Sequence, residues 1–292
     1  MNINFNCPEF YYGLEVYDKL FELQEIAPEA FYPKAKVKYI YGCLPNMIWN
    51  GGGFMDGVPE HNLDYLCAMR DFYEKNNIIL RFTLTNPLLE ETDVYDRYCN
   101  EMLKLFDNGI NEIIVNSPIL ERYLRDKFPN YKLTKSITAA KEDYDFVKAL
   151  DDYESIVLPR RHNRNWELLD SIPENKRSKI EILADESCPV DCPRLYTHYN
   201  VFANFTLFKR IDESQRNCTT MKNDGAVFPE INNKDMIYMD EILNTYLPKG
   251  YNNFKISGRN CADHCAKSIT PYFFKPEYQL EGFCQLLNVG LN

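Results

Sequence analysis

Two cysteines that follow an apolar run are the strongest chemical signal in the sequence. The segment reads Ile182-Leu183-Ala184-Asp185-Glu186-Ser187-Cys188-Pro189-Val190-Asp191-Cys192-Pro193-Arg194. The proline after each cysteine keeps the backbone out of a helix and removes an N–H donor, so both thiolates can converge on an ion from a fixed loop. The Cys-x-x-x-Cys spacing differs from the Cys-x-x-Cys of zinc ribbons, so the alternative is two cysteines packed in a proline-rich loop.

Other cysteines follow other apolar runs. Cys43 ends the run Tyr39-Ile40-Tyr41-Gly42-Cys43, and Cys218 lies in a long irregular segment. A set of three or four thiolates suits an iron–sulfur cluster or zinc. Further candidates are Cys7, Cys261 and Cys265, whereas Cys67, Cys99 and Cys284 lie in amphipathic or apolar surroundings typical of core residues.

Basic side chains near the ends of apolar runs are the second signal. Arg81 lies in Leu80-Arg81-Phe82-Thr83, Lys135 in Thr134-Lys135-Ser136, and Arg259 in Ser257-Gly258-Arg259. If these side chains share a pocket, they are suited to bind a carboxylate or phosphate of a substrate. The alternative is that they are surface residues whose aliphatic stems cover apolar neighbours. Arg160, Arg161 and Lys255 occupy comparable positions.

Two residues near the paired cysteines are candidate acid–base groups. Glu186 precedes Cys188, and His198 follows Cys192. Carboxylates and imidazoles transfer protons in many active sites, although a single such residue also commonly has a structural role. We expect Glu186, His198, Arg259, Arg81 and Lys135 to form the catalytic set.

The elements that position these residues are short strands that alternate with helices. Helical periodicity predicts one helix that begins near Leu63 and another that begins near Val94. A third helix is predicted to begin with Ser117 as N-cap and Pro118 at the first helical position. Eight runs rich in β-branched and apolar residues are predicted strands. They are Ile3–Asn6, Val37–Tyr41, Ile78–Thr83, Glu112–Val115, Lys132–Ser136, Ser155–Leu158, Ile180–Ala184 and Phe254–Ser257.

Eight alternating strands and helices predict an α/β fold, a (β/α)₈ TIM-type barrel of irregular shape. The absence of a Gly-rich phosphate loop after the first run weakens the alternative of a doubly wound nucleotide-binding sheet. One barrel domain is expected over residues 1–292, with a long insertion at 192–250 between the last two strands. The loops that follow parallel strands open onto one face, so cysteines distant in sequence can meet there.

Composition limits the classes of function. The formal net charge is −10 and the pI is about 5.1, so no extended nucleic-acid surface is expected. The sequence shows no secretory signal and no apolar run long enough to span a membrane. We therefore expect a cytoplasmic protein, in which clustered cysteines favour metal binding over disulfides.

Three segments carry a resemblance to a known family. Phe254-Lys255-Ile256-Ser257-Gly258-Arg259 resembles the Lys-Ile-Glu-Gly-Arg signature of the collagenase-like U-thirty-two (U32) peptidase family, with Ser257 in place of the usual Glu. Residues 112–117 with the following helix and residues 131–136 are similar to the central strand–helix–strand unit of that family. The stretch from Glu186 to Tyr199 is similar to its cysteine-bearing segment, although the usual His-Gly pair is absent.

The resemblance implies a barrel that carries an oxygen-labile 4Fe–4S cluster. Family members take part in oxygen-independent hydroxylation of RNA bases or of the ubiquinone ring. Carried over by position, the cluster ligands are Cys188, Cys192, Cys218 and Cys43, with Cys261 as the next choice for the fourth. The expected substrate is an anionic small molecule or a nucleotide-like compound.

Two alternatives remain open. The first is a barrel that binds zinc, or no metal, and acts as the partner subunit of another protein. The second is a true peptidase, as the family name suggests, although the sequence shows no nucleophile–base pair for proteolysis.

Overall fold

Eight short runs of buried residues form a closed barrel of parallel strands in the order β1 to β8, with β8 paired to β1. This computed structural model describes residues 1–52, 62–138, 145–185, 188, 190, 192–209, 236–258 and 261–289. The strands are β1 (Ile3–Pro8), β2 (Ala35–Gly42), β3 (Ile79–Leu84), β4 (Glu112–Val115), β5 (Lys132–Lys135), β6 (Ser155–Val157), β7 (Ile180–Asp185) and β8 (Asn253–Ile256). Each lies within two residues of its predicted bounds, and the predicted (β/α)₈ barrel is confirmed.

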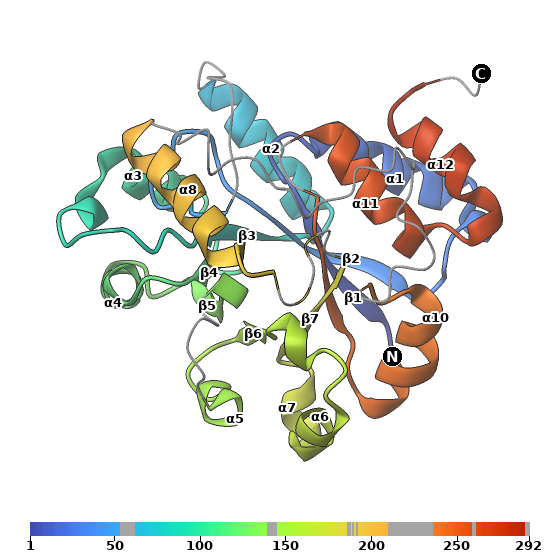
Figure 1. Cartoon of the computed structure of the whole chain (residues 1–292). Helices are drawn as coiled ribbons and strands as arrows, with labels where there is room; N and C mark the ends of the chain where they lie inside the picture. Colours follow the sequence, from blue (N-terminus) through green and yellow to red (C-terminus); the bar gives the residue numbers. More distant parts are fainter. Residues whose placement is uncertain are drawn as a thin grey trace.

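Helices surround the barrel and connect its strands (Figure 1). The α-helices are α1 (Leu14–Ile26), α2 (Leu63–Lys75), α3 (Arg97–Leu105), α4 (Pro118–Lys127), α5 (Phe146–Ala149), α6 (Trp166–Ser171), α7 (Glu174–Arg177), α8 (Leu195–Phe208), α10 (Met239–Glu241), α11 (Ala262–Phe273) and α12 (Gln279–Leu286). Shorter helical turns are η1 (Pro28–Ala30), η2 (Asp93–Tyr95), η4 (Arg160–His162), η5 (Ile242–Tyr246), η6 (Leu247–Lys249) and η7 (Pro276–Tyr278). None of the helices among these residues is long and apolar enough to cross a bilayer.

Local capping sets several helix boundaries. The Ser117 side chain accepts a hydrogen bond from the Leu120 N–H at the start of α4, as the sequence predicted. The periodic segment from Val94 to Leu105 is not one helix, because Asp96 caps a new one. Its carboxylate accepts from the Cys99 N–H, which ends η2 and begins α3.

The two faces of the strands build two different cores. Side chains alternate between the barrel interior and the surrounding helices. Phe5 of β1 points outward, where its ring packs 5.5 Å from Tyr272 and 5.2 Å from Phe273 of α11. Its neighbour Asn6 points inward, where it donates a hydrogen bond of 2.9 Å to Glu181 of β7. The outer core is therefore apolar and aromatic, whereas the interior contains charged and amide groups.

A buried ion-pair network crosses the interior. The Arg81 guanidinium of β3 contacts Glu112 of β4 at 2.7 Å and also pairs with Glu181 of β7. It lies 3.3 Å from the Ser155 hydroxyl and stacks 3.4 Å from the centre of the Tyr39 ring. Arg81 is 1% exposed, so water does not screen these contacts. Burial raises the pKa of Glu112, and Arg81 opposes that shift. The network joins strands on opposite sides of the ring.

Removal of the cation should destabilise the barrel strongly. In Arg81→Met, Glu112 and Glu181 would remain buried without a counter-charge, which typically costs about 3–5 kcal/mol. Denaturant unfolding of the variant checks this value. Arg97→Met removes an exposed i,i+4 pair with Glu101 and serves as the control, with no measurable change in midpoint expected. Equal midpoints for the two variants would contradict a structural role for the network.

Candidate functional site

The loops that follow the strands gather at the carboxyl end of the barrel, where barrel enzymes place their active centres. The loop after β2 begins at Cys43, the loop after β3 at Thr85, and the loop after β6 contains η4. The interval between β7 and β8 is the longest, from residue 186 to residue 252, and it contains α8. The candidate site is therefore built mainly from the loops after β2, β3, β6 and β7.

Helix α8 lies on the side of the barrel opposite the strand that precedes it. In the eight-strand ring, β3 is the strand across from β7. The Asn86 side chain, just after β3, donates hydrogen bonds to the Ile48 carbonyl (2.9 Å) and to the Ala203 carbonyl of α8 (3.3 Å). Figure 1 shows α8 on the side of α3 and β3, away from α6. Helix α8 follows β7 in the chain yet contacts the loops after β2 and β3, on the other side of the ring.

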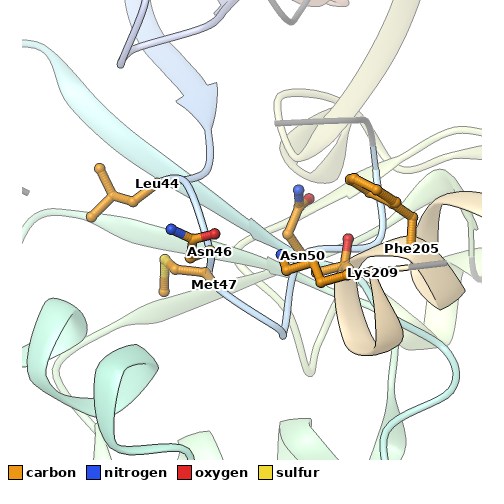
Figure 2. Close-up of a pocket in the computed structure, with 7 residues that line it drawn as sticks. Leu44, Asn46, Met47, Asn50, Phe205 and Lys209 are labelled. Carbon is orange, nitrogen blue, oxygen red and sulfur yellow. The ribbon is translucent and has the colours of Figure 1, made fainter. Parts of the chain in front are cut away.

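A small pocket marks the junction of α8 with the loop after β2. Figure 2 shows Asn46 and Asn50 of that loop facing Phe205 and Lys209 at the end of α8. Lys209 has a left-handed backbone conformation (φ 54°) that ends the helix. The remaining lining residues are Leu44, Met47 and Thr206. The pocket shows where the helix is seated on the rim.

His198 lies on the inner side of α8. Along the helix, Thr197, Asn200 and Asn204 are exposed, whereas Val201 and Thr206 are buried. This pattern defines one outward and one inward face, and the half-buried His198 lies beside the inward one. Its Nε2 atom is buried and has no hydrogen-bond partner among the described residues.

The imidazole of His198 favours its neutral form. Burial, followed by the charge of nearby Arg194, holds the pKa of His198 below its ordinary value of 6.5. A neutral imidazole carries one ring nitrogen with a free lone pair, which can accept a proton at neutral pH. His198 therefore retains the candidate acid–base role that the sequence predicted.

Cys188 and Cys192 both lie in the loop after β7, but the predicted ligand group is not complete around them. Cys192 is 8% exposed and Cys188 is half-buried. Over the described ranges, no three His, Cys, Asp or Glu side chains are grouped as a metal ion requires. Cys43 and Cys261 therefore do not join these two thiols. Cys43 instead donates to the Met47 sulfur at 3.6 Å, and Cys261 precedes α11.

Cys7 and Cys265 form a separate buried pair of thiols outside the barrel. Cys265 of α11 lies 3.3 Å from the Tyr17 hydroxyl and 3.5 Å from the Pro8 carbonyl. Burial, followed by the neighbouring Cys265 thiol, raises the pKa of Cys7. Thiols in this state are poor nucleophiles and poor ligands, because both roles require the thiolate. These two cysteines belong to the core between β1, α1 and α11.

Arg81 and Lys135 do not lie where the sequence placed them. Arg81 is the third residue of β3 rather than a residue beyond its end, and its guanidinium is engaged by Glu112 and Glu181 inside the barrel. Lys135 is the last residue of β5. Because successive side chains of a strand point to opposite faces and Thr134 points inward, Lys135 points outward. The Lys135 Nζ atom lies 3.2 Å from the Tyr153 hydroxyl, which donates to a carboxylate of α4. Neither cation faces the mouth.

Two other cations occupy the carboxyl half of the barrel. Lys255 of β8 is 8% exposed, and its Nζ atom lies 3.9 Å from the centre of the Tyr41 ring. Arg160 is the first residue of η4, directly beyond β6, and is 9% exposed. The sequence named both residues among the strand-end cations but not in the expected catalytic set.

Three predicted site residues, Glu186, Cys218 and Arg259, lie outside the described residues. The cluster ligands and the catalytic set that include them remain predictions. Asn86, in contrast, is a site-forming residue that the sequence analysis missed. Its signal was an asparagine before Pro87 at the end of a strand, a pattern typical of a turn with side-chain hydrogen bonds.

Comparison with known proteins agrees with the predicted resemblance. The chain is 27% identical over 236 residues to the uncharacterized protease MJ1657 of Methanocaldococcus jannaschii, which covers 76% of this chain and 67% of that protein. Among solved structures it is similar to the U32 peptidase Mk0906, with 13% identity, a TM-score of 0.45 and coverage of 74% of this chain and 82% of that one. No family model matches the sequence. The predicted resemblance to a family named as peptidases agrees with the protease name of the relative from Methanocaldococcus jannaschii.

Loss of the Asn86 side chain should loosen α8 from the rim. In Asn86→Ala, the carbonyls of Ile48 and Ala203 would lose a shared donor, at an expected cost of about 1–3 kcal/mol. Hydrogen exchange should accelerate in the second half of α8, with the barrel strands unaffected. Asn204→Ala, on the exposed face of the same helix, is the matched control. Unchanged protection of α8 would show that Asn86 does not hold the helix.

Proposed function

We propose that this chain, which resembles the U32 peptidase family, is an enzyme with His198 as the acid–base group of an active centre at the carboxyl end of the barrel. The observation that carries the proposal is the buried Nε2 atom of His198, which has no hydrogen-bond partner within the described ranges. A buried polar atom without a partner costs free energy unless a ligand or a reacting group satisfies it. His198 lies beside the inward face of α8, the helix that is seated on the rim by Asn86.

Peptide hydrolysis is the reaction that we propose first. The similar archaeal protein is named a protease, and hydrolysis requires a group that moves protons near neutral pH. The Nε2 atom of His198 has no thiol partner among the described residues, so we infer that the nucleophile is water. The imidazole would take one proton as water oxygen bonds to the carbonyl carbon. It would return that proton to the leaving amine as the C–N bond breaks.

Substitution of the imidazole should abolish most of the activity. His198→Gln keeps a polar side chain of similar size but cannot accept and return a proton, so kcat/KM on an unstructured protein substrate should fall about 100-fold or more. In the wild-type protein the rate should decline on the acid side only below about pH 6.5, because the lowered pKa keeps His198 neutral above that value.

The control for this experiment is His264→Gln, a change of the same type at an exposed position of α11. It should leave the rate and its pH dependence unchanged. Activity that survives His198→Gln, or an acid limb that is identical in that variant, would contradict the assignment.

A second candidate is redox chemistry on an iron–sulfur cluster. It is favoured by the position of Cys188 and Cys192 in one loop after β7, in the same interval of the chain as Cys218. Such a cluster would supply electron transfer, and cysteine thiolates are its usual ligands. Among the described residues Cys43 packs against Met47 and no third ligand side chain is grouped with Cys188 and Cys192, whereas Cys218 lies outside those residues. No step of a reaction is therefore assigned to a cluster.

Metal analysis separates the two candidates. Anaerobically purified protein with a cluster should contain iron and sulfide and absorb visible light, and Cys188→Ser and Cys192→Ser should each abolish the absorption. Cys43→Ser and Cys67→Ser, the latter on α2, should retain it. One zinc per chain in place of iron would favour the alternative of a zinc-binding partner subunit. Colourless protein free of metal would contradict the cluster.

A further inference from the structure

Arg160 is a buried cation without a counter-charge among the described residues. It is 9% exposed, and its Nη2 atom is fully buried without a hydrogen-bond partner in the part of the chain that the structure describes. No described carboxylate forms an ion pair with it. Because a guanidinium does not lose its proton in proteins, the cost of burying its charge cannot be avoided by a shift in pKa.

Other arginines of this protein show how unusual this is. Arg81 is more deeply buried, at 1% exposed, and Glu112 and Glu181 both pair with it. Arg164, only four residues after Arg160, forms a two-point contact with Glu241 through Nε and Nη2, both at 2.8 Å. In the part of the chain that the structure describes, carboxylates therefore pair with Arg81 and Arg164 but not with Arg160. Local violations of such pairing are expected at functional sites.

The backbone around Arg160 is held in place. The His162 N–H donates to the Pro159 carbonyl at 2.8 Å, and the Asn163 N–H donates to the Arg160 carbonyl at 3.0 Å. The Asn163 side chain donates to the Leu183 carbonyl of β7 at 2.9 Å, and the Tyr246 hydroxyl donates to the Asn163 carbonyl at 2.7 Å. The loop is thus fixed before any ligand arrives, which lowers the entropic cost of binding.

The local charge favours an anion although the whole chain is acidic. Residues 160–164 read Arg-Arg-His-Asn-Arg, in a protein of net charge −10. A guanidinium offers two parallel N–H donors that match the oxygens of a carboxylate or a phosphate. In a site shielded from water such a contact is stronger than at the surface.

We propose that Arg160 anchors an oxyanion-binding subsite at the carboxyl end of β6, which holds a carboxylate or phosphate group of the substrate. The subsite deepens the proposed function. That the bound anion is part of a substrate rests on the proposed function. Binding itself is independent of turnover and of His198. A substrate class follows: molecules that carry an accessible oxyanion next to the reacting bond.

Ligand-induced thermal stabilisation of the full chain tests the subsite. The probes are inorganic phosphate, N-acetylalanine and N-acetylalanine amide, which lacks the carboxylate. The melting temperature of the wild-type protein should rise with phosphate or N-acetylalanine but not with the amide. The anion that gives the larger shift identifies the group. No shift with either anion would overturn the proposal.

Arg160→Met provides the decisive comparison, because it keeps the aliphatic stem and removes the charge. Its affinity for the preferred anion should be about 10- to 100-fold weaker. Without ligand it should melt at a higher temperature than the wild type, since an uncompensated buried charge is gone. A structural arginine would give the opposite shift in melting temperature, and unchanged affinity would also overturn the proposal.

Two further variants complete the design. Arg161→Gln, at the exposed neighbouring position, should bind the anion as the wild type does. His198→Gln should also bind it, even where it has lost turnover. If His198→Gln remains active while Arg160→Met loses the anion, the acid–base assignment fails and the subsite stands. The two proposals can therefore fail separately.

Discussion

The barrel depends on one buried electrostatic contact, the pairing of Arg81 with Glu112 and Glu181. It joins β3 to its neighbour β4 and also to β7, across the ring. A barrel interior of this size must be filled by side chains, and here a long guanidinium spans it where most barrels use branched apolar residues. The arrangement is stable only if every member is present, because each charge is hidden from water.

This contact also divides the interior into two regions with different tasks. The amino-terminal half is closed by paired charges and amides, so it holds its own counter-ions. The carboxyl half contains Lys255 against Tyr41, and beyond it lie Arg160 and the inner face of α8. Arg160 and His198, whose buried Nη2 and Nε2 atoms have no hydrogen-bond partner among the described residues, lie in this second region. The unpartnered Arg160 and His198 atoms therefore lie in the region where barrel enzymes bind their ligands.

The fold was accessible from the sequence, and most of the site was not. Alternation and β-branched runs located the strands because burial selects residues locally. Arg81 was placed at the mouth although the predicted strand already continued to Thr83, because the sequence does not show that an inward-facing arginine is held by carboxylates of other strands. Glu112 and Glu181, also near the starts of their strands, were the available signal for an internal pair.

The thiols illustrate a different limit. We expected cysteines that follow different strands to meet at one end of the barrel. Cys7 instead points outward, and Cys43 contacts Met47. A shift of one residue along a strand turns a side chain from the interior to the surrounding helices, and the composition of the strand does not reveal that shift. His198 was identified by residue type and by its nearness to the cysteines. Its orientation depends on the seating of α8 by Asn86, a long-range contact that no local pattern encodes.

The pairing of the first strand with the last has a consequence for biosynthesis. Asn4 and Phe5 of β1 face Asn253 and Phe254 of β8, so the ring cannot close until the ribosome has made nearly the whole chain. Until then β1 presents one unsatisfied edge of backbone amides and carbonyls, which is a template for association with other chains. The brief life of that edge, rather than the stability of the finished barrel, sets how readily the nascent protein aggregates.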